Sequence, residues 1–214
     1  TQHGGRPGVD PRPGPCVNPR NPHSATPALR ALFVALQEWV TKGTKPPPSR
    51  VPSLTAGTAV TAEHVRMPEI KGFAVPRGAN PILPPVDWVD PPEASPPAPY
   101  STFVSAVDSD GNEVAGILLP SIAVPLGTYT GWNVYRAQPD ELADRDGSLI
   151  AFTATRAERE SAGDPRPSLA ERYGTKKAYA ARVEAAAASL VAERLLLPND
   201  AEAYVAAARN CDRF

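Results

Sequence analysis

The sequence holds few of the residues that metal, redox and thiol chemistry require. Its 214 residues include two cysteines, Cys16 and Cys211, and three histidines, and no CxxC or HExxH motif occurs. Because a zinc site or a catalytic thiol normally needs several partners nearby, we expect no metal and no cofactor. A disulfide between the two cysteines and a pair of free, buried thiols both stay open, since the sequence does not reveal the distance between their Cα atoms.

Long apolar runs and an excess of one charge are also lacking. No apolar run approaches the roughly 20 residues of a membrane-spanning helix. With 22 basic and 23 acidic residues, nothing in the charge balance attracts nucleic acid or an anionic membrane. We therefore expect a soluble protein with no nucleic-acid partner and no membrane partner. Its localisation stays open and includes a secreted or periplasmic location.

The beginning of the chain has no methionine, no basic segment and no apolar segment. Met67 is the only methionine, and the first six residues are small or polar. This start lacks the features of a signal peptide. It favours a fragment or a processing product over a native terminus.

Proline, in contrast, is abundant, with 27 residues. Because proline fixes φ and removes a backbone donor, long uninterrupted elements are excluded from much of the chain. We expect residues 1–23 to form a loop rich in turn formers, and residues 51–99 to hold little regular structure. Better strand patterns occur over 100–107 and 113–119, joined by a hairpin turn at 109–112.

An amphipathic helix is predicted over 26–42. Thr26 can cap its N-terminus, Pro27 fits its first turn, and Gly43 fits the position after its end. Six large apolar residues follow at helical spacing and form one stripe: Leu29, Leu32, Phe33, Leu36, Trp39 and Val40. Residues 1–23 offer no surface that would cover this stripe, so we expect it to dock on another surface.

The last part of the chain is predicted to be helical over 168–210. Ser168 begins a capping box for a short helix that Gly174 ends, and Thr175 can cap a longer one. The longer helix carries an apolar face formed by Tyr179, Val183, Ala186, Ala187, Leu190 and Val191. We expect Pro198 to stop it and a last helix to begin one or two residues later.

Three histidines are the candidates for acid–base chemistry. His3 lies in Thr1-Gln2-His3-Gly4, a loop of small residues that lets an imidazole approach a reacting centre, ahead of the predicted helix. His23 and His64 have no comparable context, and a lone histidine is usually structural or exposed. The candidate catalytic residue is therefore His3.

The stretch around His3 and several later stretches resemble a bacterial family of "alpha/beta hydrolase domain" proteins. They are 1–4, 14–22, the helix that includes Trp39, 46–50, 107–116, 124–133 and 163–168, in the family's order along nearly the whole chain. The resemblance implies a serine hydrolase that acts on carboxylic esters. In the α/β-hydrolase fold the triad histidine follows the last strand and the final helix packs back on the sheet, so the resemblance implies this role for His3.

The same resemblance implies that the other triad members lie outside this sequence, because the family places serine and acid before histidine. The sequence holds no G-x-S-x-G motif; Gly127 and Gly131 have the right spacing, but Tyr129 stands between them in place of serine. Asp10 follows His3 and is interpreted as a loop carboxylate. We therefore expect the N-terminal part of the same hydrolase, missing or a separate chain, as the partner for a small-molecule ester substrate, and no activity from this chain alone.

The predicted fold class is α/β. Residues 1–50 are expected to be the histidine loop and final helix of an α/β-hydrolase core, 51–160 a proline-rich, β-containing extension, and 161–214 a helical C-terminal segment. The alternative is a non-catalytic ligand-binding or structural module. Tyr129 and Trp132 are candidates for lining a pocket, and the competing interpretation is a tight strand-to-turn connection with a buried tryptophan.

Overall fold

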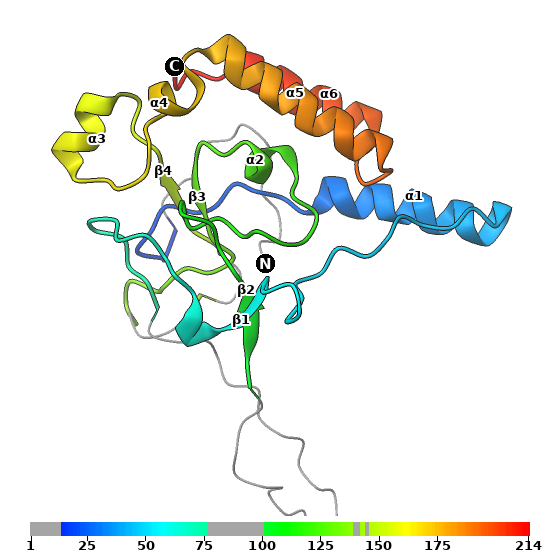
Figure 1. Ribbon diagram of the computed structural model, residues 1–214, viewed down its shortest axis with the longest axis horizontal. Coiled ribbons are helices and arrows are strands. Elements are labelled where there is room, and N and C mark those ends of the chain that lie inside the picture. The colour runs from blue at the N-terminus through cyan, green and yellow to red at the C-terminus, as the bar shows by residue number, and fades with distance from the viewer. Residues whose placement is uncertain (1–13, 77–100, 139–141, 144–145) are drawn as a thin grey trace, which may run out of the picture.

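The computed structural model describes residues 14–76, 101–138, 142–143 and 146–214 (Figure 1). Its helices are α1 (Thr26–Lys42), α2 (Pro120–Ala123), α3 (Arg156–Ala162), α4 (Leu169–Tyr173), α5 (Lys176–Ala192) and α6 (Pro198–Arg209), with a 3-10 turn over Ala62–His64. Its strands are β1 (Ala59–Thr61), β2 (Phe103–Ser105), β3 (Gly127–Tyr129) and β4 (Leu149–Ala151). Helices and strands are mixed, as the α/β class predicts.

The strands of the described residues form two small antiparallel sheets. β1 pairs with β2, and β3 pairs with β4 so that Thr128 lies opposite Ile150. Gly127 permits this second pairing, because a Cβ there would lie 2.5 Å from the carbonyl oxygen of Ile150. The β3–β4 pair lies at the centre of the molecule, and the chain after β4 leads to α3 and then to helices α4, α5 and α6 (Figure 1).

The predicted hairpin is only partly correct. Val107 and Glu113 form an antiparallel bridge across the expected turn, but 113–119 is not a strand, and 103–105 pairs with 59–61 instead. The side chain of Asn112 explains the difference, since it donates to the carbonyl of Gly127 (3.1 Å) and accepts from the backbone N–H of Tyr129 (2.8 Å). This amide attaches the turn to β3, and the chain after it leads into α2.

The helical prediction for 168–210 is confirmed by α4, α5 and α6. Ser168 and Thr175 cap their helices as expected, and α5 packs beside α6 (Figure 1). Two details were wrong. Pro198 begins α6 rather than preceding it, because the first turn of a helix tolerates a missing N–H. Helix α3, whose capping box uses Thr155 and Glu158, was not predicted.

An apolar cluster holds this helical part together. It contains buried side chains from α4, α5 and α6, one from α1, and several from the connecting segments: Ala28, Leu119, Val124, Phe152, Leu169, Tyr173, Tyr179, Ala180, Val183, Ala187, Leu190, Leu195, Leu196, Tyr204 and Ala208. Tyr173 and Tyr179 pack edge to face with ring centroids 5.1 Å apart. Burial of these side chains is the main stabilising contribution here.

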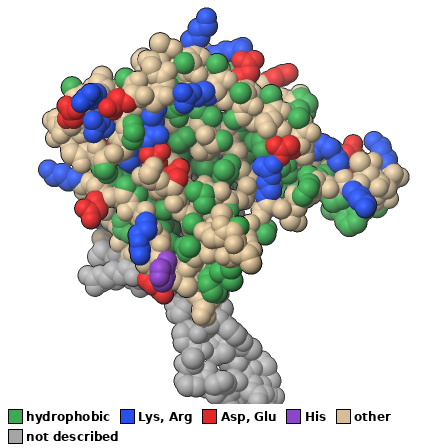
Figure 2. All heavy atoms as spheres, viewed as in Figure 1, with side chains coloured by type: hydrophobic (Ala, Val, Ile, Leu, Met, Phe, Trp, Pro, Cys, Tyr) green, Lys and Arg blue, Asp and Glu red, His purple; other side chains and the backbone are tan. Residues whose placement is uncertain are grey.

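Helix α1 has the predicted bounds, and Gly43 ends it with φ of 70°. The predicted cap was wrong, because Ala25 holds the N-cap position without a side-chain cap hydrogen bond, and Thr26 is the first residue of the helix and donates its N–H to the Oγ of Ser24 (3.3 Å). The buried face consists of small residues, Ala28, Ala31 and Ala35. All six residues of the large apolar stripe are exposed, and Figure 2 shows hydrophobic side chains at the surface of this projecting helix.

Two buried asparagines connect the segment before α1 to the β3–β4 region. Asn133 donates to the carbonyls of Asn18 and Gly147, both at 3.1 Å, and accepts from the backbone N–H of Asn18 at 3.2 Å. Asn21 donates to the carbonyl of Thr130 at 3.0 Å. Because a buried amide without partners would be costly, these paired side chains fix the position of the loop.

Candidate functional site

A cavity of about 1110 Å³ lies beside the β3–β4 sheet and is the candidate functional site. One wall is formed by the chain from Ala62 to Pro76, and a second by β2 with the Val107–Glu113 turn. Residues 129–132 and the end of α3 with Gly163 complete the lining. Most of the lining is apolar: Ala62, Val65, Met67, Pro68, Ile70, Phe73, Val75, Pro76, Val104, Val107, Tyr129, Trp132, Leu142 and Ala162.

Trp132 and Phe73 form a stacked aromatic pair that lines this cavity. Their rings are stacked, with centroids 5.4 Å apart and an interplanar angle of 17°. Both residues are only partly buried, so the stacked rings remain accessible. The interpretation of Trp132 as a fully buried core residue therefore does not describe its environment.

Hydrogen bonds from buried side chains hold these two rings in place. The carbonyl of Trp132 accepts from the Oγ1 of Thr130 at 2.5 Å and from the Oγ of Ser148 at 2.8 Å. The side chain of Asn18 donates to the carbonyl of Ala74 (3.2 Å) and accepts from its N–H (3.4 Å). Since Ala74 follows Phe73 directly, the amide fixes the backbone that carries the second ring.

Tyr129 also borders the cavity, but its hydroxyl lies in the helical core. It hydrogen bonds to the backbone of Leu126, and it interacts electrostatically with Arg213, Tyr173 and Cys211. Burial raises the pKa of Tyr129 to about 12. The phenol is therefore neutral and does not offer its polar end to a ligand.

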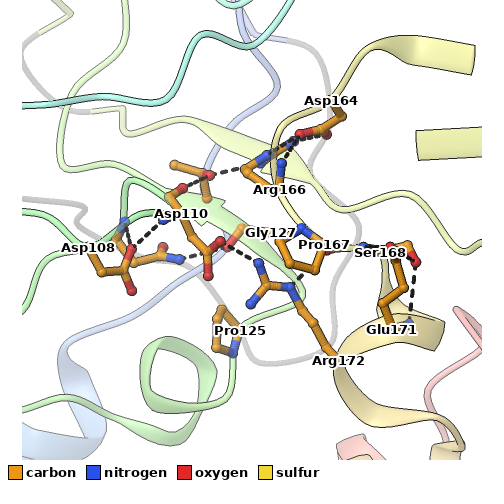
Figure 3. A network of polar contacts seen from close by, with 12 residues as sticks. Asp108, Asp110, Pro125, Gly127, Asp164, Arg166, Pro167, Ser168, Glu171 and Arg172 are labelled. Atoms are coloured by element: carbon orange, nitrogen blue, oxygen red, sulfur yellow. Dashed lines mark hydrogen bonds and ion pairs between the residues drawn. The ribbon is translucent and has the colours of Figure 1, made fainter. Parts of the chain in front are cut away.

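A buried arginine network lies next to the cavity (Figure 3). Arg166, which is 2% exposed, donates through Nε and Nη2 to both carboxylate oxygens of Asp164 (2.9 and 2.6 Å). It also donates to the hydroxyl of Thr128 and to the carbonyl of Ile150, each at 2.8 Å. Burial pushes the pKa of Asp164 up, but the hydrogen bonds and charge of Arg166 hold it below its usual value.

This network is structural, because its donors are used by protein acceptors. Arg172 continues it by pairing with Asp110, donating to the carbonyl of Pro167 and lying over the ring of Phe152 at 4.1 Å (Figure 3). Ser168 lowers the pKa of Glu171 to about 2 through its hydroxyl and its backbone N–H. The network joins β3, β4 and α4, and its two hydroxyls are engaged within it: that of Thr128 donates to the carbonyl of Asp110 and that of Ser168 to the carboxylate of Glu171 (2.7 Å).

Ser121 and His23 form a serine–histidine pair that the sequence analysis did not identify. The Nδ1 of His23 lies 2.8 Å from the Oγ of Ser121, and Tyr204 of α6 hydrogen bonds to the same serine. Burial lowers the pKa of His23 to about 4, so the imidazole is neutral near pH 7 but is a weak base. Neither residue lines the cavity. We interpret the three side chains as a polar link between α2, α6 and the start of α1.

The remaining candidates contribute no further site within the described residues. His3 and Asp10 lie outside the described residues. His64 is exposed, and its Nδ1 hydrogen bonds to the Oγ1 of Thr61 at 2.7 Å. Cys16 and Cys211 are free thiols, and burial raises the pKa of Cys16.

The described part of the chain holds neither a metal-binding cluster nor a membrane-spanning helix. Its histidine, cysteine, aspartate and glutamate side chains form no group of three that could hold a metal ion. None of its helices is both long enough and apolar enough to cross a membrane.

Comparison with known proteins identifies the family. A family model described as "Alpha/beta hydrolase domain" matches residues 2–206. The chain belongs to this family. The resemblance inferred from the sequence is thereby confirmed, and hydrolase is the general class that the family supports. No curated protein and no solved structure matches the chain.

The family-like stretches with known positions have structural roles in this chain. Asn133 of the 124–133 stretch binds the backbone of Asn18 in the 14–22 stretch, and Asn21 of the latter binds the carbonyl of Thr130 in the former. Asp164 and Arg166 of the 163–168 stretch form the buried ion pair. No sequence signal distinguished Phe73 or Glu113 as cavity residues, because both reach the cavity only through long-range packing.

Proposed function

We propose that this chain is part of a serine-type carboxylic ester hydrolase and that His3 is its triad histidine. In the proposed enzyme the nucleophilic serine and the acid come from the N-terminal part of the same hydrolase, outside this sequence. His3 would accept the serine proton and return it to the leaving alcohol. The observation that carries the proposal is the family match over residues 2–206 in a sequence without G-x-S-x-G.

The exposed face of α1 supports the proposal that a further part of the hydrolase packs here. Leu29, Phe33 and Val40 are 62%, 69% and 77% exposed, although their spacing places them on one face. An apolar face of this size normally meets another surface, and the core of the hydrolase is the surface that the family suggests.

The test replaces His3 in the complete gene product. His3→Ala should lower kcat for a short-chain aryl ester by about 10⁴-fold or more, since a triad acts as a unit, with little change in KM or Tm. The rate of the wild-type enzyme should rise with pH through a pKa of about 7, because the neutral imidazole is the base.

His64→Ala is the matched control, because this histidine is exposed and its Nδ1 hydrogen bonds to Thr61 of the same turn. It should leave kcat within about threefold of wild type, as surface changes are usually mild. Full activity in His3→Ala together with a loss in His64→Ala would contradict the role of His3.

A non-catalytic ligand-binding module is the second candidate function. The cavity beside Trp132 and Phe73 favours it, since it is large, mostly apolar and lined by fixed aromatic rings. The complete gene product distinguishes the two candidates. A complete protein that binds a ligand and hydrolyses no ester would favour the binding module.

A further inference from the structure

The cavity has the size and surface of a small-molecule site. Its volume of about 1110 Å³ exceeds the ~300–1,000 Å³ of most small-molecule pockets, so it has room for more than a single ring. Aliphatic side chains such as Val104 and Ile70 line it together with the stacked rings of Phe73 and Trp132. A flat apolar body would bury the most surface against such a wall.

The aromatic wall is fixed before any ligand arrives. The hydroxyls that hold the Trp132 carbonyl and the amide that holds Ala74 belong to Thr130, Ser148 and Asn18, which are all buried. A ligand therefore loses little affinity to ordering of the protein, because the rings do not need to be brought together on binding.

The charges around the cavity restrict the ligand further. The charged side chains among the described lining residues are those of Glu69, Glu113, Glu160 and Lys71. Arg156 and Arg159 pair with Glu160 at 2.7 and 3.4 Å, so the carboxylates of Glu69 and Glu113 remain against the ammonium group of Lys71. Like charges repel, and the repulsion is stronger near low-dielectric protein than in water. A carboxylate or phosphate on the ligand would therefore be disfavoured.

We propose that this cavity binds a molecule with a flat, apolar, fused-ring body and no negative charge. The Phe73–Trp132 pair receives the ring body, and Glu113 in the cavity lining rejects anionic groups. The inference depends on the cavity alone and holds whether or not the chain takes part in ester hydrolysis.

The test uses isothermal titration calorimetry at pH 7 to measure the binding of two compounds that share a naphthalene ring and differ in the charge of their substituent. The neutral probe 2-naphthol should bind the full chain saturably at one site. The anionic probe 2-naphthoate should bind at least about tenfold more weakly, because it meets the carboxylates of Glu69 and Glu113. Equal affinities, or no saturable binding of 2-naphthol, would overturn the proposal.

Variants locate the binding site. Trp132→Ala should weaken 2-naphthol binding about tenfold or more, because it removes half of the ring wall. Val104→Trp, which fills the cavity from β2, should do the same without touching Trp132. Circular dichroism and a cooperative melt establish that each variant is folded. If Trp132→Ala does not fold, the affinity of Val104→Trp for 2-naphthol decides whether the cavity is the binding site.

Two further variants separate this site from the exposed face of α1. Trp39→Ala is the control, since Trp39 is 52% exposed on α1 and does not line the cavity, and it should leave the affinity within about twofold. Glu113→Gln should strengthen 2-naphthoate binding several-fold and leave 2-naphthol unchanged. Loss of binding in Trp39→Ala with full binding in Trp132→Ala would place the site on α1 and refute the proposal.

Discussion

Helices α1 and α5 have the same length, 17 residues, but they pack in opposite ways. α5 buries its large apolar side chains, among them Val183 and Leu190, and exposes charged ones such as Glu184. α1 buries three alanines and exposes its large apolar stripe. Both helices carry an apolar stripe in their sequence. The stripe identifies an apolar face of a helix, but it does not determine which face the rest of the chain covers.

The orientation of α1 follows from the contacts on its buried side. Arg30 pairs with Asp200 of α6, and Glu38 pairs with Arg194 after α5, at 2.7 Å. Between these pairs the buried face of α1 carries only small side chains, Ala31 and Ala35. The large residues then point away from the rest of the described chain, and α1 extends from the body of the molecule (Figure 1).

The largest expected difference between the two helices concerns stability. Leu190→Ala on α5 removes a side chain that is 4% exposed and should lower the free energy of unfolding by about 2–5 kcal/mol. Leu29→Ala on α1 is the matched control, because the same side chain is 62% exposed there, and it should change stability by less than about 0.5 kcal/mol. Urea unfolding measures both. Equal losses would mean that α1 buries its stripe in solution.

The link between α1 and the helical core should depend on pH. The pKa of His23 is about 4 in the folded chain, against a usual value of 6.5, so the unfolded chain binds a proton more readily between these values. Stability should therefore be complete above pH 6.5 and fall as the pH falls toward 4. The expected loss between pH 7 and pH 5 is about 2 kcal/mol.

Variants isolate the contribution of this histidine to the pH dependence. His23→Gln should be less stable at pH 7 and should lose most of the slope between pH 7 and pH 5. His64→Gln should keep the wild-type slope, because His64 is exposed. Chemical unfolding at each pH measures the effect, and an unchanged slope in His23→Gln would contradict the assignment.

Substitutions in the exposed stripe of α1 should have the smallest effect on stability but a clear effect on self-association. The exposed stripe of α1 should bind a hydrophobic dye and promote self-association of the chain. Phe33→Glu combined with Val40→Glu should remove most of the dye fluorescence and change the free energy of unfolding by less than about 0.5 kcal/mol. Val51→Glu is the control outside α1, and it should leave dye binding unchanged. A wild-type chain that binds no dye and stays monomeric would contradict the exposed face.

Much of the local structure could be predicted from the sequence. The bounds of α1 follow from apolar periodicity and from Gly43, and the starts of α4 and α5 follow from Ser168 and Thr175. These signals work because helix termini need side-chain partners within three residues along the chain. The family resemblance was also visible in the sequence, since short motifs in a fixed order identify a family without any knowledge of contacts.

The tertiary structure decided everything that depends on distant residues. It determined that 103–105 pairs with 59–61, that Phe73 stacks on Trp132, and that Asn18 holds the backbone next to Phe73. It also directed the hydroxyl of Tyr129 into the helical core and the apolar stripe of α1 outward. The physical reason is the same in each case: periodicity and capping act over a few residues, whereas pairing, stacking and burial depend on which segments the whole chain brings together.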